Sequence, residues 1–111
     1  MIAEAIVVEI PITISIPGDY ADWATYETAL PYLVPNDRLY LRGVAAQGTV
    51  TLDAEDDGTL GNEIVIYFRG EGTLDLASND YITVYHHPNA TISNSAGTGI
   101  TLIPFNGAAG L

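Results

Sequence analysis

Three carboxylates in the middle of the chain have the spacing of a calcium-binding loop. Asp53, Glu55 and Asp57 are followed at once by Gly58, which matches positions one, three, five and six of such a loop. Carboxylates this close together repel one another unless a cation lies between them. The twelfth position, where the motif needs a bidentate carboxylate, is Ile64. The calcium motif is therefore incomplete, and we expect a solvated acidic loop without a bound metal ion.

Two adjacent histidines, His86 and His87, are the only imidazoles of the chain. Neighbouring residues of a strand point to opposite faces, so the pair does not converge on one metal ion without a bend. Pro88 marks a turn directly after them, and the sequence offers no obvious third ligand. We expect neither histidine to bind a metal.

The sequence contains no complete catalytic set. A glycoside hydrolase needs two carboxylates at a matched separation, for which Asp75 and Asp80 are candidates. A chain with 14 acidic residues offers some such pair by chance, so the pair is not a specific signal. No Ser-His-Asp arrangement and no glycine loop that could cradle a phosphate can be assembled. We expect no enzymatic activity and no cofactor.

The charge balance restricts the class of partner. The chain has 111 residues, which fits one domain, and its 14 acidic against three basic side chains give a net charge of −11. Such a chain cannot replace the counterions of a phosphate backbone, so we expect no nucleic-acid binding. Its acidity suits a solvated surface or a basic partner. Cysteine is absent, which excludes disulfides and Cys-based metal sites, and no apolar run is long enough to span a membrane.

A repeat of 18 residues organises the second half of the chain. The tetrapeptide IVIY at 64–67 returns as ITVY at 82–85 and as ITLI at 100–103, and residues 73–76 return as 91–94. Alternating apolar residues at a fixed period predict short strands that stack, each turn of the chain burying the face of the one before it. We therefore expect a mainly β fold, namely a short single-stranded β-helix, or solenoid. A small β-sandwich or jelly roll is the alternative, because several short strands separated by turns also allow it.

The first 18 residues are predicted to form an extended arm. Apolar residues alternate along it as in a strand, but Pro11 removes a backbone donor in its middle, which is typical of an edge strand. Glu4 and Glu9 interrupt the stretch and no basic segment precedes it, so we expect no signal peptide. We expect the arm to add as a strand to a neighbouring subunit or another protein. The residues expected to make this contact are Ile6, Val8, Ile10, Ile12 and Ile14.

Residues 19–111 are expected to form a single domain that begins with a capping helix. The helix is predicted over 20–30, with Asp19 as its N-cap and Pro31 as its stop. Trp23 and Tyr26 have helical spacing, and we expect this aromatic stripe to pack against the domain. The helix would then cover one end of the solenoid.

Several segments together resemble the N-terminal cap and first coils of pectin-lyase-like parallel β-helix proteins. The helix carries Trp-Ala-Thr, residues 36–43 read NDRLYLRG, residues 61–66 read GNEIVI, and residues 89–95 read NATISNS. The resemblance covers residues 19–105 and favours a right-handed solenoid. Three hexapeptides of a left-handed β-helix would give the same 18-residue period. The family includes polysaccharide lyases and hydrolases, phage tailspikes and other virion parts, so the fold alone does not give the function. Its lyases use a basic residue beside calcium-binding aspartates, whereas Arg69 is the only cation in the repeats here.

A short solenoid with an extended arm, open ends and no catalytic set is typical of a structural or interaction module. By analogy with phage β-helices, we expect a virion component: a capsid decoration (cement) protein on the capsid surface. Its expected partners are further copies of itself, as a homotrimer, and a major capsid protein, with no nucleic acid and no membrane. The alternative is a carbohydrate-binding or carbohydrate-cleaving β-helix, such as a tailspike head domain or a fragment similar to a polysaccharide lyase.

Overall fold

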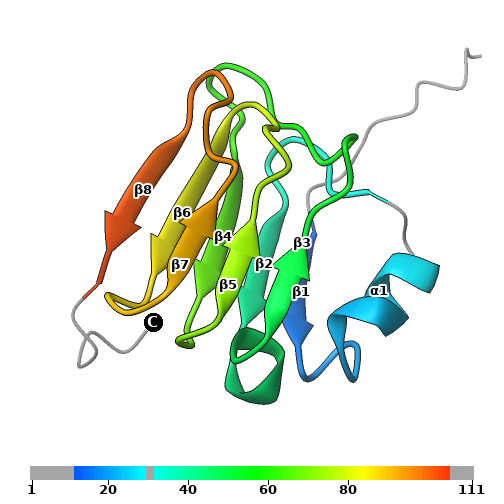
Figure 1. The fold of residues 1–111 in the computed structure, drawn as a ribbon. Helices are drawn as coiled ribbons and strands as arrows, with labels where there is room; N and C mark the ends of the chain where they lie inside the picture. Colours follow the sequence, from blue (N-terminus) through cyan, green and yellow to red (C-terminus); the bar gives the residue numbers. More distant parts are fainter. Residues whose placement is uncertain (1–11, 30–31, 106–111) are drawn as a thin grey trace, which may run out of the picture.

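The computed structural model describes residues 12–29 and 32–105, which form two parallel β-sheets and one α-helix (Figure 1). The five-stranded sheet has the order β1 (Thr13–Ile16), β2 (Arg38–Leu41), β4 (Ile64–Phe68), β6 (Ile82–His86) and β8 (Thr101–Pro104). The three-stranded sheet has the order β3 (Thr49–Thr51), β5 (Thr73–Asp75) and β7 (Thr91–Ser93). The helix α1 spans Trp23–Ala29, and a short 3₁₀ helix spans Gly43–Ala46. The prediction of a mainly β protein with one helix is confirmed.

All strand pairs among the described residues are parallel. Immunoglobulin-type sandwiches and jelly rolls are built from antiparallel strands. The alternative of a small β-sandwich or jelly roll is therefore wrong.

The 18-residue repeat sets the register between neighbouring strands, because paired residues are 18 positions apart. Ile64 pairs with Ile82, and Ile66 pairs with Val84, which in turn pairs with Leu102. The other sheet follows the same period, since residues 73–75 of β5 pair with residues 91–93 of β7. Equivalent residues of successive repeats thus lie side by side in adjacent strands.

The core lies between the two sheets, because alternate residues of each strand point inward. Inward side chains of the five-stranded sheet, such as Leu39, Ile66 and Val84, are fully buried, and Leu74 lies opposite them in the three-stranded sheet. Close stacking of the chain requires a small residue at Gly72, where a Cβ atom would collide with the carbonyl oxygen of Gly48. The rest of the buried apolar set is Ile14, Ile16, Trp23, Tyr26, Leu33, Leu41, Ala46, Val50, Leu52, Ile64, Phe68, Leu76 and Ile82.

The end of the predicted N-terminal arm belongs to the sheet. Residues 13–16 form β1, which pairs with β2 of the same chain, and Ile14 is only 2% exposed. This corrects the prediction that Ile14 contacts another subunit, because its side chain is used in the core. Ile12 is 42% exposed. Ile6, Val8 and Ile10 lie outside the described residues.

The helix α1 begins later than predicted. Asp22, and not Asp19, is in the N-cap position, because its Oδ1 accepts the backbone N–H of Thr25 at 2.8 Å. This hydrogen bond lowers the pKa of the Asp22 carboxyl. Trp23 and Tyr26 pack on the core as predicted, with their rings stacked at a centroid distance of 4.9 Å. In Figure 1, α1 lies beside β1 and β3, at the end opposite β7 and β8. Among the described residues, no helix is long and apolar enough to cross a membrane.

Candidate binding face

Three tyrosines form a stacked ladder on the outer face of the five-stranded sheet. Tyr40, Tyr67 and Tyr85 lie in register on β2, β4 and β6. Their ring centroids are 4.4 and 5.1 Å apart, and the ring planes deviate from parallel by 5° and 10°. Each such aromatic pair contributes about 0.5–1.5 kcal/mol beyond the burial of its surface. Because the rings cover one another's faces, the ladder presents mainly ring edges and hydroxyl groups to the outside.

All three arginines of the chain extend from the same face. Arg38 is the first residue of β2, and Arg42 continues that strand in extended conformation, with its backbone N–H bonded to the Ile16 carbonyl. Arg69 continues β4, since its backbone N–H donates to the Leu41 carbonyl. These residues alternate with inward-pointing ones, so they share the outer face with the tyrosines. We call the surface formed by Arg38, Tyr40, Arg42, Tyr67, Arg69 and Tyr85 the Tyr–Arg face.

The Tyr–Arg face is a basic surface on an otherwise acidic chain. Its arginines are the entire complement of Lys and Arg in a chain of net charge −11. Within residues 12–29 and 32–105, no carboxylate forms an ion pair with any of them. The Nη1 of Arg38 donates to the Tyr67 hydroxyl at 3.4 Å, and the Nη2 of Arg42 donates to the Pro17 carbonyl at 3.4 Å. None of the outward-facing positions in the five strands carries a carboxylate.

This arrangement can bind an extended anionic partner. A guanidinium group donates two parallel hydrogen bonds to a carboxylate, and the tyrosine hydroxyls add further donors between the arginines. His87 and Phe105 extend the same face beyond Tyr85, with their rings edge to face at 6.3 Å. The partner is expected to present several carboxylates at strand-like separations. A sugar ring could stack only on the free faces of Tyr40 and Tyr85, because the other ring faces cover one another.

The predicted calcium candidates have other partners in the structure. Asp57 Oδ1 accepts the backbone N–H of Asp80 at 2.7 Å, and so joins two successive turns of the chain. The backbone of Asp53 contacts Asp56, whereas Glu55 is exposed. Among the described residues, no group of three or more His, Cys, Asp or Glu side chains is arranged to hold a metal ion.

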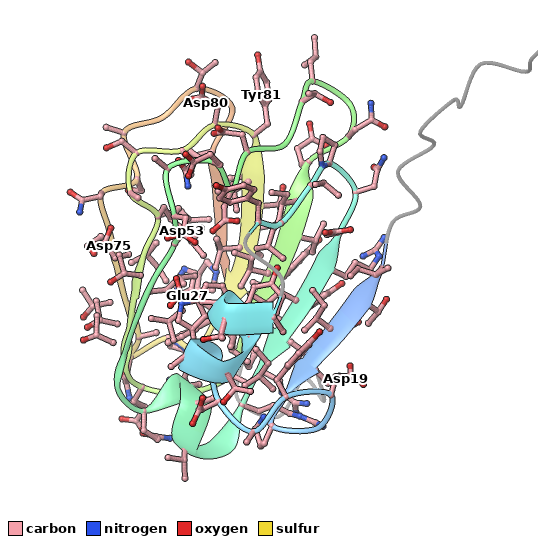
Figure 2. The ribbon with its side chains drawn as sticks, turned by 90° about the vertical axis from the view of Figure 1, so that its right-hand side faces the viewer. Asp19, Glu27, Asp53, Asp75, Asp80 and Tyr81 are labelled. Atoms are coloured by element: carbon pink, nitrogen blue, oxygen red, sulfur yellow. The ribbon has the colours of Figure 1, made fainter. Side chains whose placement is uncertain are left out.

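Asp75 and Asp80, the candidate hydrolase pair, both bind backbone or side-chain donors of the next repeat. Asp75 Oδ1 accepts the side-chain amide of Asn94 at 2.8 Å, and Asp80 Oδ1 accepts the backbone N–H of Thr98 at 2.8 Å. Figure 2 shows Asp75 on the outside of the three-stranded sheet and Asp80 in the loops at the top of the molecule. The structure therefore gives both carboxylates a role in joining successive repeats. The described residues form no pocket.

The two histidines do not converge. His86 is the last residue of β6, and its Nδ1 lies 2.9 Å from the carbonyl oxygen of His87. The Nδ1 of His87 accepts the backbone N–H of Asn89 at 3.0 Å, in the turn that follows β6.

A buried carboxylate that the sequence did not single out lies near α1. Asp56 is 1% exposed and accepts the backbone N–H groups of Leu33 and Asp53. Burial raises its pKa to about 6, and the two hydrogen bonds oppose this shift. The hydroxyl of Tyr26 is also buried and has no hydrogen-bond partner among the described residues. Burial, with the nearby Asp56 charge, raises the pKa of this phenol.

The Tyr–Arg face was missed at the level of sequence, although a signal was present. Residues 38–42 read Arg-Leu-Tyr-Leu-Arg and residues 65–69 read Val-Ile-Tyr-Phe-Arg, so alternate positions hold Arg, Tyr and Arg in the first segment and Val, Tyr and Arg in the second. Alternation alone places these side chains on one face. Only the pairing of β2 with β4 shows that the two strands are neighbours.

No family model, no curated protein and no solved structure matches this chain.

Proposed function

We propose that this chain is a non-catalytic attachment module that binds an acidic surface through the Tyr–Arg face. The observation that supports it is the concentration of every Lys and Arg of the chain on one outer sheet face, without ion pairs among the described residues. The chain has 14 carboxylates, so an arginine with a purely structural role would be expected to pair with one of them. Arginine and tyrosine are also the residues enriched at the energetic centres of interfaces.

The two sheets are proposed to be the long faces of one short β-helix. From β2 to β8 the strands alternate between the five-stranded and the three-stranded sheet, as successive turns of a solenoid do. Connections between parallel strands of one sheet are almost always right-handed, which supports the right-handed form. A β-helix suits attachment because its outer faces are rigid and regularly spaced.

The proposed setting is the surface of a virion, where the chain acts as a capsid decoration protein on a major capsid protein. Support comes from the resemblance to phage β-helices and from the small size of the chain. Co-sedimentation of the purified chain with isolated capsid shells of the encoding virus tests this setting. A chain that stays in the supernatant would contradict the virion setting, but it would leave the Tyr–Arg face as a binding surface for another acidic partner.

A second candidate partner is an acidic polysaccharide. Three tyrosine hydroxyls in a row, flanked by arginines, match the repeated carboxylates and hydroxyls of a uronic-acid polymer. Such binding would use the edges of the ladder rather than stacking on ring faces.

The binding test compares two variants of equal net charge. The first is the triple variant Arg38→Gln, Arg42→Gln and Arg69→Gln. The control, Gln47→Glu, Leu60→Glu and Ala96→Glu, lowers the net charge equally at exposed positions away from the Tyr–Arg face. Binding to immobilised poly-glutamate and polygalacturonate is measured by biolayer interferometry. We expect the first variant to lose binding at least tenfold and the control to retain it.

An Arg→Lys triple variant separates charge from geometry. It keeps the three positive charges but loses the planar two-donor fork, so we expect an intermediate affinity. Equal binding by the wild type and the Gln variant on both polymers would overturn the Tyr–Arg face as the binding site. Preference for one polymer decides between an acidic protein surface and a polysaccharide.

A further inference from the structure

The last strands of the two sheets have open backbone edges. The N–H of Phe105 donates to the His86 carbonyl on β6, so alternation along β8 turns the N–H and C=O of Leu102 away from the sheet. In β7 the N–H of Thr91 donates to the Gly72 carbonyl of the preceding turn. The N–H and C=O of the next residue, Ile92, therefore point away from the sheet, towards its open edge. Among the described residues, no strand lies beyond β7 or β8.

Apolar side chains of the core reach the surface at this open end. Val84 is fully buried, whereas Leu102, its partner on β8, is 38% exposed. Ile92 and Ile100 are only partly buried against the core. The end of the molecule thus combines unpaired backbone groups with incompletely covered apolar side chains, which is the combination that β-strand addition uses.

The segment that forms this end carries no Asp, Glu, Lys or Arg of its own. Asp80 is the last Asp, Glu, Lys or Arg of the sequence, so no charged side chain of these types follows in residues 81–111. Two copies of a chain with net charge −11 repel each other over most of their surface. Contact through this segment minimises this repulsion, and interface centres are depleted of charge in general.

At the opposite end, hydrogen bonds occupy the outward backbone groups of Ser15 on β1 and the Thr51 carbonyl on β3. The outward N–H of Ser15 on β1 donates to Asp19 Oδ2 at 2.8 Å, and the Ser15 carbonyl accepts the Asp19 N–H at 2.8 Å. On β3 the Trp23 indole N–H donates to the Thr51 carbonyl at 3.1 Å. A carboxylate on the β1 edge also repels a further acidic chain. Stacking β8 of one copy on β1 of the next is therefore unfavourable, which leaves pairing of two open ends.

We propose that two copies of this chain associate through their open ends, with β8 antiparallel to β8 of the second copy across a twofold axis, in place of the homotrimer expected from the sequence. This inference stands on different residues from the Tyr–Arg face. Pro104 lacks an N–H on the open edge, so Leu102 provides the outward donor of β8. In an antiparallel pair, two opposed residues exchange both hydrogen bonds, and a twofold axis places Leu102 opposite its own copy. The exposed Leu102 side chains then cover each other.

The test is the molar mass of the full chain over a range of concentrations, measured by sedimentation velocity. The monomer has a mass of 11.8 kDa, and we expect the wild type to sediment as a dimer. Leu102→Glu places two like charges together at the axis and should give a monomer. Ile12→Glu is the matched control, because Ile12 is similarly exposed at the opposite end of the same sheet, and it should remain dimeric.

A second variant keeps the test decisive if Leu102→Glu perturbs folding. In the antiparallel pair Thr101 faces Ile103 of the second copy, so Thr101→Lys with Ile103→Lys places each lysine opposite a lysine of the second copy, a repulsion that the monomer lacks. Both side chains point outward from the sheet, and the monomer should keep its wild-type circular dichroism.

Four results would overturn the proposal. They are a wild type that is monomeric at all concentrations, a trimer, a dimer insensitive to both variants, or a dimer that forms only after residues 106–111 are deleted. The last result would mean that the chain's own C-terminus covers the open end.

Discussion

The two ends of the five-stranded sheet are treated differently by the same chain. At the β1 end, Asp19 occupies both outward backbone groups of Ser15, and α1 covers the adjoining core. At the β8 end, Leu102 is partly exposed and nothing among the described residues pairs with its backbone. Figure 2, viewed from the closed end, shows Glu27 on α1 in front of the sheets and Asp19 below β1. A repeat therefore sets how strands stack, but residues outside it decide whether an end is closed.

The largest expected loss of stability is at a buried position in the middle of the five-stranded sheet, compared with its equivalent at the open end. Val84→Asp buries an unpaired carboxylate in a fully covered position, and we expect it to lower the free energy of unfolding by about 4 kcal/mol or more. Leu102→Asp, in the same row on β8, should cost less than half as much in the monomer because its carboxylate reaches water there. Urea denaturation followed by circular dichroism measures both, at protein concentrations too low for self-association. Equal losses in the monomer would show that residues of the same chain cover the β8 end.

Removing the helix cover is the next largest change. Trp23→Ala deletes a side chain that is 9% exposed and its hydrogen bond to Thr51, so we expect a loss of about 3 kcal/mol in the free energy of unfolding. Phe105→Ala, which removes an aromatic side chain at the open end, should cost less than about 1 kcal/mol. Thermal and urea unfolding of both variants test the contrast. A smaller loss for Trp23→Ala than for Phe105→Ala would refute the view that α1 closes its end.

Mild acid should raise the free energy of unfolding through the buried Asp56, which lies near α1. The folded pKa of Asp56 is raised to about 6, above its ordinary value of 3.8, so the folded state binds the proton more tightly. Stability from this group is present in full below the unfolded pKa and is lost as the pH rises through 6. Wild-type stability is therefore expected to increase as the pH falls from 7 to 5.

Asp56→Asn removes that part of the pH dependence. Its amide nitrogen cannot accept the second backbone N–H, so we also expect a loss of about 1–2 kcal/mol at pH 5. The free energy of unfolding is measured in urea at both pH values for the two proteins. The difference between their pH profiles isolates Asp56 from the general repulsion of the acidic surface. Parallel profiles would contradict the shifted pKa.

The smallest expected loss of stability comes from removing the hydrogen-bond acceptor at the edge of β1. Asp19→Ala leaves the N–H of Ser15 without its acceptor, at a cost of about 1 kcal/mol or less because the site is exposed. Asp19→Asn keeps a side-chain oxygen and should be nearly neutral. The sharper readout is self-association, since a freed β1 edge allows further strand addition. Sedimentation velocity should show larger species for Asp19→Ala than for Asp19→Asn. Identical profiles would mean that Asp19 does not prevent strand addition at the edge of β1.

Local pattern predicted the elements better than their boundaries. The helix was expected because Trp23 and Tyr26 have helical spacing, and both do pack on the core. Its N-cap was placed at Asp19, but Asp22 has that position because Asp19 bonds to Ser15 instead. Two carboxylates three residues apart are equivalent caps on local grounds. Contact with β1 is what distinguishes them.

The candidate site was less predictable than the fold. Alternation placed the arginines and tyrosines of β2 and β4 on one face of each strand, but 27 residues separate Tyr40 from Tyr67, unlike the 18 of the repeat. The ladder therefore depends on the pairing of β2 with β4. The calcium spacing of Asp53, Glu55 and Asp57, in contrast, was visible in the sequence and has no counterpart in the geometry.

The register of the repeated strands could be read from the amino-acid sequence. An 18-residue period with alternating apolar residues allows each inward side chain to pack on its own equivalent, and a shift of one residue would turn the apolar set outward. The folded structure was needed to show that Ile14 is core, that every arginine shares one face and that, within residues 12–29 and 32–105, one end has its edge hydrogen-bonded while the other is open. These outcomes depend on contacts between segments far apart in the chain, for which neighbouring residues carry no signal.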